Sequence, residues 1–182
     1  MANFRLSVRK IEKGDLPVLV SWAKNSALIK HFHVPLPQTE QAAGQWFQLS
    51  LINKLRDDFV IYVADEDGNK KTIGMMGLFN IDEQNKKAEY YVIIGDSQFI
   101  RRGIAYRTSM EMLSKCFGEL GLNKIILHID IEHYEAQHLA EKLGFRREGI
   151  LSQDILLEDG TAQDRLLYGQ TAQQWHENNT KQ

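Results

Sequence analysis

The most informative stretch for chemistry is Ala88 to Ala105, where the pattern predicts a strand, a short loop and the start of a helix. The loop ends in Arg101-Arg102-Gly103. The first N–H groups of a helix have no intrahelical partner, and the helix dipole adds positive potential there. Gly103 permits close backbone approach, and both arginines supply charge, so the segment favours a diphosphate ligand. A solvated helix start would use the same residues.

The elements that position this loop begin with a strand at Phe4 to Ile11 and a helix that opens at Gly14 and runs to about Lys24. Residues 26 to 37 are predicted to be irregular, and a helical stretch containing Trp46 follows Thr39. Apolar runs separated by charged turns then predict a meander of three strands, Phe59–Ala64, Thr72–Ile81 and Ala88–Gly95.

In the second half of the chain, apolar residues first recur at the spacing of a helix. The pattern there predicts a helix from Gly103 to Leu120, a buried strand at Ile125–Ile131, a short helix at Glu135–Leu143, and two strands flanking the turn Glu158-Asp159-Gly160. The order βααβββαβαββ, a meander followed by a strand-helix-strand crossover, indicates an α/β fold with a mixed central sheet and helices on both faces. One domain over residues 1–182 accounts for the whole length.

Composition excludes several classes of protein. The chain has 43% hydrophobic and 25% charged residues, and no apolar run approaches the roughly 18 to 20 residues that span a bilayer. Met1 to Lys10 lacks the apolar stretch of a secretory signal, so we expect a cytoplasmic protein without membrane contact. The net charge of -2 and a pI near 6.3 do not favour nucleic acid as a partner. The single cysteine, Cys116, excludes an internal disulfide and a cysteine-built metal site.

The loop Ile100 to Ala105 resembles the diphosphate-binding loop of the GNAT superfamily of acyl-CoA-dependent N-acyltransferases, which reads Gln/Arg-x-x-Gly-x-Gly/Ala after a strand. Further matches follow in order along the chain: Leu122-Asn123-Lys124, Glu135-Ala136, Leu143-Gly144-Phe145, Glu148-Gly149, Asp159-Gly160 and Asp164. The chain looks most like the branch that holds spermidine, amino-sugar and ribosomal-protein N-terminal acetyltransferases.

The resemblance implies an enzyme that uses acetyl-CoA as co-substrate and acetylates a primary amine by direct attack in a ternary complex. It implies that the cofactor lies against Val92, Ile93, Ile94, Arg101, Arg102, Gly103, Ile104, Ala105, Tyr106 and His133. A backbone N–H near Val92 to Ile94 is expected to meet the oxyanion. Ile100 departs from the usual Gln or Arg, which removes one side-chain contact and leaves the backbone cradle.

Three candidate catalytic residues accompany this cofactor site. Glu89 matches a glutamate on the corresponding strand of related enzymes, and it could hold the substrate ammonium or relay its proton. The alternative is a carboxylate that faces solvent or pairs with Lys86 or Lys87. Ala140 stands where the family commonly has a tyrosine that protonates the CoA thiolate, so we consider His133 and Tyr134, or solvent, for that role.

Other histidines receive no role: His128 is interpreted as a core histidine and His138 and His176 as surface residues. The acceptor is expected along Ser26 to Glu40, where Glu40 is the only acid, which disfavours a polyamine. Lys30, His31 and His33 would fit an anionic acceptor such as a nucleotide-linked amino sugar.

The favoured substrate is a small metabolite amine, and both an amino sugar and a polyamine stay open. The N-terminus of a ribosomal protein and a non-catalytic CoA-binding module are the alternatives. The oligomeric state stays open, a homodimer included.

Overall fold

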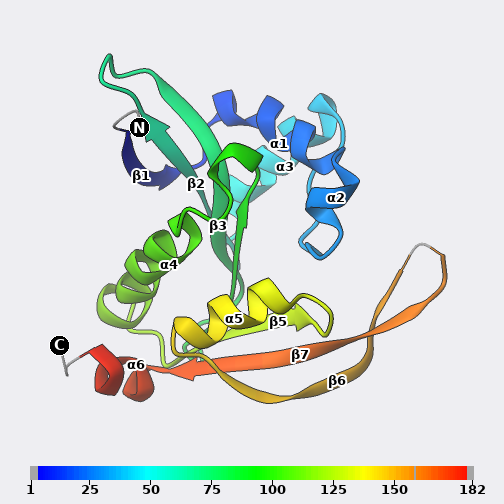
Figure 1. Cartoon of the computed structure of the whole chain (residues 1–182), viewed down its shortest axis with the longest axis vertical. Coiled ribbons are helices and arrows are strands. Elements are labelled where there is room, and N and C mark those ends of the chain that lie inside the picture. The colour runs from blue at the N-terminus through cyan, green and yellow to red at the C-terminus, as the bar shows by residue number, and fades with distance from the viewer. Residues whose placement is uncertain (1–3, 158, 180–182) are drawn as a thin grey trace. The chain divides into compact units, whose positions relative to one another are not determined.

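The structure is a computed structural model that describes residues 4–157 and 159–179 (Figure 1). Residues 1–3 of the predicted N-terminal pattern and Glu158 of the predicted turn lie outside the described residues. In the described part of the chain, hydrogen-bonded neighbours in the sheet follow the order β1 (Arg5–Lys10), β2 (Asp57–Ala64), β3 (Lys70–Asp82), β4 (Lys87–Ile94), β5 (Lys124–Asp130), β7 (Ala162–Thr171), β6 (Arg146–Leu156). The chain divides into two compact units, Met1–Phe79 with Tyr91–Thr108 and Asn80–Tyr90 with Ser109–Gln182. The single domain over 1–182 stays a prediction.

Antiparallel strands make the sheet of the first unit. β1 (Arg5–Lys10) pairs with β2 (Asp57–Ala64), and β2 pairs with β3 (Lys70–Asp82), whose last residues belong to the second unit. Buried β-branched residues such as Val60 and Ile61 fill the centre of β2. The three predicted strands of this region are confirmed, with shifts only at their ends.

Three helices lie beside one another in the first unit (Figure 1). α1 (Leu16–Ala23) follows a 3₁₀ turn, η1 (Lys13–Asp15), and α3 (Glu40–Ile52) is capped by Thr39, whose hydroxyl accepts from the N–H of Ala42 at 3.2 Å. The short α2 (Ser26–Ile29) corrects the prediction of an irregular segment. Its signal was Asn25, whose side chain accepts from the N–H of Leu28 at 3.2 Å.

The helices of this unit pack on its strands through one apolar core. Its buried members are Ile11, Leu16, Leu19, Val20, Trp22, Ala43, Val60, Met75, Tyr91 and Ile93. Trp22 lies so close to Gly95 that a Cβ at residue 95 would be 2.1 Å from the indole Cε2. The strand end before the predicted cofactor loop therefore requires glycine.

A buried carboxylate ties α1 to the sheet. Asp15 is 4% exposed and accepts from Arg9 Nη1 and Nη2 at 2.6 and 2.9 Å and from Thr72 Oγ1 at 2.7 Å. Burial raises its pKa, but these hydrogen bonds outweigh burial and hold the pKa of Asp15 below its ordinary value.

A strand-helix-strand crossover follows the meander, as predicted. β4 (Lys87–Ile94) leads through a 3₁₀ turn, η2 (Ser97–Phe99), into α4 (Ile104–Ser114), and a π-helical turn, η3 (Lys115–Glu119), ends that helix. β5 (Lys124–Asp130) then pairs with β4 in parallel.

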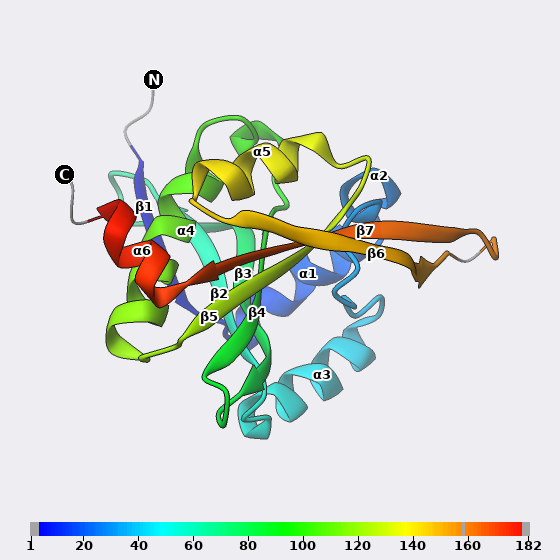
Figure 2. The same cartoon turned by 90° about the horizontal axis from the view of Figure 1, so that it is seen from below.

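The second unit is completed by a long hairpin and two helices. β6 (Arg146–Leu156) and β7 (Ala162–Thr171) run side by side, and the tip of this hairpin lies away from α5 (Tyr134–Lys142) in Figure 2. β7 also pairs with β5, antiparallel.

A final helix, α6 (Ala172–Asn179), is absent from the predicted order. It begins with a capping box, because Thr171 Oγ1 accepts from the N–H of Gln174 at 3.2 Å and Gln174 Oε1 accepts from the N–H of Thr171 at 2.9 Å. Trp175 stacks on Phe117 with ring centroids 5.6 Å apart, so its indole anchors the helix.

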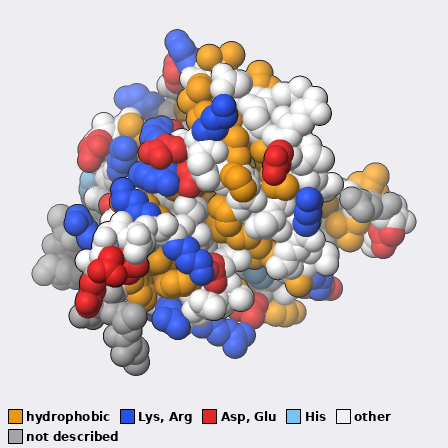
Figure 3. Space-filling view, turned by 90° about the horizontal axis from the view of Figure 1, so that it is seen from above, with side chains coloured by type: hydrophobic (Ala, Val, Ile, Leu, Met, Phe, Trp, Pro, Cys, Tyr) orange, Lys and Arg blue, Asp and Glu red, His pale blue; other side chains and the backbone are white. Residues whose placement is uncertain are grey.

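The remaining features concern the single cysteine, the surface and the length of the helices. Cys116 is fully buried, as predicted, and burial raises the pKa of its thiol to about 12. The face in Figure 3 shows bands of apolar side chains with groups of acidic and basic side chains beside them. Over the described ranges, the structure has no helix with the length and apolar character needed to cross a bilayer.

Candidate active site

The loop between β4 and α4 is anchored to the first unit at its start. The N–H groups of Gly95 and Asp96 both donate to the carbonyl oxygen of Ile73, at 2.9 and 3.0 Å. The carboxylate of Asp96 accepts from the N–H of Gln98 at 3.0 Å and pairs with Lys71 Nζ at 2.6 Å. These bonds fix the loop without using the residues predicted to bind a ligand.

The end of this loop turns through two left-handed residues, Arg101 with φ 60° and Gly103 with φ 70°. Nothing lies within 4 Å of a Cβ built on Gly103, so the backbone is open to a ligand there. The N–H of Arg107 donates to the carbonyl of Gly103 at 3.1 Å. α4 therefore begins at this loop, and N–H groups at a helix start are the ones that a bound anion commonly uses.

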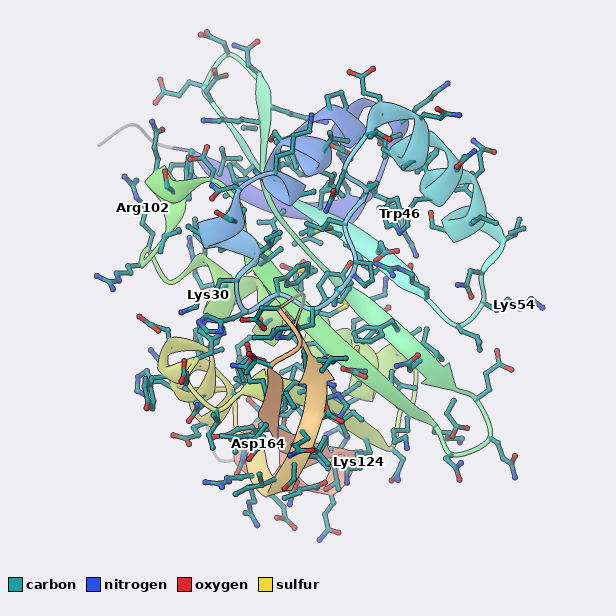
Figure 4. All side chains as sticks on the ribbon, turned by 90° about the vertical axis from the view of Figure 1, so that its right-hand side faces the viewer. Lys30, Trp46, Lys54, Arg102, Lys124 and Asp164 are labelled. Atoms are coloured by element: carbon teal, nitrogen blue, oxygen red, sulfur yellow. The ribbon has the colours of Figure 1, made fainter. Side chains whose placement is uncertain are left out.

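Charge at the helix start complements an anion. Arg101 and Arg102 are exposed, and Figure 4 shows Arg102 extending outward from this loop. The guanidinium of Arg102 lies 5.5 Å from the ring centroid of Phe99, a cation–π contact that limits its freedom. Ile104 is buried and fixes the first turn, whereas Ala105 and Tyr106 are half-buried. Open backbone, helix dipole and arginines together fit a diphosphate.

The second unit holds Glu89, and it is not the solvent-facing carboxylate of the alternative interpretation. It is 7% exposed, and its partners are His128 and Asn80 in place of Lys86 or Lys87. His128 Nδ1 lies 2.6 Å from Glu89 Oε1, and Asn80 Nδ2 donates to Oε2 at 3.2 Å. His128 is thus a half-buried, hydrogen-bonded member of a polar cluster.

The candidates for thiolate protonation lie at the start of α5. His133 is the N-cap residue and half-buried, and Tyr134 follows it with 71% of its surface exposed. Ala140 is 1% exposed, so a tyrosine at that position would need its neighbours to move. Replacing Ala140 with the tyrosine that is common in the family would therefore disturb packing, and the variant would not test thiolate protonation alone.

An aromatic cluster in the first unit surrounds a second buried carboxylate. Tyr91 donates to Asp58, which also accepts from Arg56 Nε at 2.6 Å. Burial and then the negative charge of Asp58 raise the pKa of Tyr91 well above its ordinary value. The ring of Tyr91 contacts Phe32 and Phe79, with centroids 5.6 and 6.0 Å away.

Trp46 completes this cluster from α3. Its ring lies 5.3 Å from the Arg56 guanidinium, while Lys54 beyond the helix end points outward in Figure 4. Phe32 and Trp46 both pack on the core, so this cluster connects the segment of the predicted acceptor to the strands.

With this geometry in place, comparison with known proteins defines the class. Residues 5–146 match the acetyltransferase (GNAT) domain, and the chain belongs to that family. It is an acetyl-CoA-dependent N-acetyltransferase. The β4–α4 loop stays the predicted site of the co-substrate's diphosphate.

Among similar proteins are bacterial spermidine N(1)-acetyltransferases. That of Vibrio cholerae is 27% identical over 162 residues, which cover 89% of this chain and 90% of the relative. That of Escherichia coli is 31% identical over 152 residues, which cover 84% and 78%. A crystal structure of spermidine N-acetyltransferase from Vibrio cholerae with CoA and spermine matches with a TM-score of 0.82 and 25% identity, over 93% of this chain and 97% of the other.

The sequence singled out Glu89 as a candidate catalytic residue but did not reveal the side chains that hydrogen-bond to it. His128 interrupts an apolar, β-branched strand, and a polar residue in such a run is a signal that we interpreted as core packing. Asn80 and Asp58 carried no pattern, because their hydrogen-bond partners, Glu89 and Tyr91, lie on other strands, 9 and 33 positions away. The cofactor and catalytic assignments of individual residues stay predictions.

Proposed function

We propose that the chain transfers the acetyl group of acetyl-CoA to a primary amine of a small metabolite, with polyamines as the first acceptor class and amino sugars as the second. The amine attacks the thioester directly in a ternary complex. The likeness to spermidine acetyltransferases over 84% and 89% of this chain carries the proposal. A putative ribosomal N-acetyltransferase of Bacillus subtilis, 28% identical, matches over only 56% of this chain and 55% of its own length.

The aromatic cluster supports the first class. The rings of Phe32 and Phe79 both contact Tyr91, which donates to the buried carboxylate of Asp58. Aromatic rings attract ammonium groups and pack against methylene chains, the two components of a polyamine. Asp58 is already paired with Arg56, so it adds little attraction for a second cation.

The predicted acceptor segment, residues 26 to 40, supports amino sugars as the second class. Lys30 is exposed, His31 and His33 are half-buried, and Glu40 is the only acid between residues 26 and 40. An amino sugar with an attached phosphate would meet this positive charge more favourably than a polyamine would.

The test is thiol release from acetyl-CoA with spermidine, spermine, a nucleotide-linked amino sugar and a peptide with a free N-terminus. We expect kcat/KM for a polyamine or amino sugar to exceed that for the peptide by at least about tenfold, which corresponds to ~1.4 kcal/mol in transition-state binding. Turnover restricted to the peptide would overturn the proposal. Tight acetyl-CoA binding without turnover of any amine would favour the non-catalytic module.

A further inference from the structure

Three neighbouring strands each contribute one side chain to a polar cluster in the second unit. Asn80 comes from the end of β3, Glu89 from β4 and His128 from β5. The side chain of Glu89 is 9% exposed and that of His128 17%, while Asn80 lies at the surface. The cluster therefore runs from a buried carboxylate through a half-buried imidazole to solvent.

The hydrogen bonds of this cluster assign its donors and acceptors. Both oxygens of Glu89 accept, one from Asn80 Nδ2 and one from His128. A carboxylate accepts only, so His128 Nδ1 carries the proton of their 2.6 Å bond. The neutral imidazole then has its lone pair on Nε2, which has no hydrogen-bond partner within the described part of the chain.

The backbone holds the amide of Asn80 in place. Its φ of 50° is in the left-handed region, which asparagine tolerates better than other residues with a side chain. This conformation occurs at the point where β3 has passed its last pair with β2, between Leu78 and Asp57. The backbone conformation at Asn80 thus helps to set the direction of its amide.

The imidazole also lies where ligands bind in parallel sheets. β4 and β5 are parallel, and their last register pair is Glu89 with Ile126. His128 is two residues further in the direction in which both strands run, on the same face as Ile126. Ligands of such sheets bind outside the carboxyl ends of the strands.

The helix α5 covers the opposite face of β5 and β7. Its Glu141 accepts from the hydroxyl of Tyr168, and Tyr168 is the register partner of Leu127, which points away from the face of His128. The charged side chains that share the face of His128 on these two strands are Lys124, Asp130 and Arg165. Lys124 pairs with Glu148 and Arg165 with Asp154.

From this geometry we infer that His128 Nε2 is the group that accepts the proton of the substrate ammonium, and that Glu89 and Asn80 are positioning residues that orient the imidazole and stabilise its charged form. This assignment rests on the proposed function, because it requires an amine substrate. It replaces Glu89 as the direct proton acceptor: the carboxylate is buried and both of its oxygens are occupied.

The step balances as follows. The ammonium gives one proton to His128 Nε2, and the imidazolium that forms is stabilised by the carboxylate of Glu89. The freed amine nitrogen forms a bond to the thioester carbonyl carbon, and the carbon–sulfur bond breaks. The second proton lost by the nitrogen ends on the CoA thiolate, and the imidazolium returns its proton to solvent.

The experiment is the pH dependence of kcat/KM in four variants, with the best amine of the panel and saturating acetyl-CoA. His128→Gln should lower kcat/KM about 100-fold at pH 7, and the deficit should shrink as pH rises toward ~10, where the amine itself loses its proton. Acetyl-CoA affinity by calorimetry should stay unchanged. His138→Gln, at an exposed position of α5, is the matched control and should match the wild type.

Two further variants test the cluster without removing the imidazole. Glu89→Gln removes an opposite charge and should move the acid limb of the profile to lower pH, whereas Asn80→Asp adds one and should move it to higher pH. These opposite shifts are expected even if His128→Gln folds poorly, and a purely structural role would produce neither.

The outcomes separate this inference from the proposed function. If Glu89→Gln abolishes the acid limb and His128→Gln retains it, the carboxylate is the proton acceptor and the inference is wrong. A deficit of His128→Gln that is equal at pH 7 and pH 10 also overturns it. A wild-type protein that binds acetyl-CoA but acetylates no amine overturns the proposed function, and this assignment with it.

Discussion

Gly103 makes the predicted cofactor loop sensitive to a single side chain. Its φ of 70° is costly for any other residue, and a β-branched side chain there is disfavoured most. We expect Gly103→Val to move the loop backbone and to weaken acetyl-CoA binding by about tenfold or more, the loss of ~1.4 kcal/mol of helix-terminus interaction. Calorimetric titration of acetyl-CoA measures this.

A matched control exists in the same unit. Gly68, in the turn between β2 and β3, has φ 82° and nothing within 4 Å of a built Cβ. Gly68→Val should produce similar backbone strain and leave the acetyl-CoA affinity unchanged. Equal affinity loss in both variants would mean that strain and not position weakens binding, and would contradict the placement of the site.

Asp15 makes the first unit sensitive to acid. Because its folded-state pKa is below its ordinary value, its contribution to stability is complete above about pH 4 and is lost as the pH falls through the folded-state pKa. Asp15→Asn should lower the free energy of unfolding at pH 7 by ~2 to 3 kcal/mol, since it weakens a charge-assisted bond and leaves Arg9 short of a partner.

Urea denaturation at pH 7 and pH 3 tests this prediction. The stability difference between Asp15→Asn and the wild type should be smaller at pH 3 than at pH 7. Asp65→Asn is the control, because Asp65 accepts hydrogen bonds from Asn69 in an exposed turn and should matter less. A difference that is the same at both pH values would show that the charge of Asp15 does not contribute.

Among the elements, α6 depends most visibly on its cap. Thr171→Ala removes the acceptor for the N–H of Gln174 and should lower the free energy of unfolding by ~1 kcal/mol. Thr171→Ser keeps the hydroxyl and should stay within ~0.5 kcal/mol of the wild type. Urea denaturation of the three proteins measures this, and equal losses in both variants would point to strand packing at Thr171 in place of capping.

The elements also show what the sequence could and could not predict. Strands such as β2 and β5 are recognisable because burial imposes apolar, β-branched runs, and α4 because its apolar spacing follows the helical period. α2 and α6 were missed because their evidence is two short caps, Asn25 and Thr171, beside sequences of weak periodicity. Periodicity reports long elements, whereas short helices depend on single hydrogen bonds.

At the scale of the whole molecule, the class of enzyme was predictable and the hydrogen-bond partners of Glu89 were not. The resemblance of the loop, and of the segments that follow it in order, indicated a GNAT acetyltransferase, which the family match confirms. The contact of Glu89 with His128 joins residues 39 positions apart, and no local pattern records such a pair. Site residues that depend on neighbours across a sheet require the structure.

The burial of Cys116 has a practical consequence for every measurement of turnover. The reaction releases the thiol of CoA, and chromogenic thiol reagents measure this release directly. The chain has one cysteine, and in the folded state it is buried, which raises the pKa of its thiol to about 12. We therefore expect the folded enzyme to add no background signal in an assay with a thiol reagent. Slow reaction of one thiol per chain in the absence of substrate would indicate that the protein unfolds during the assay.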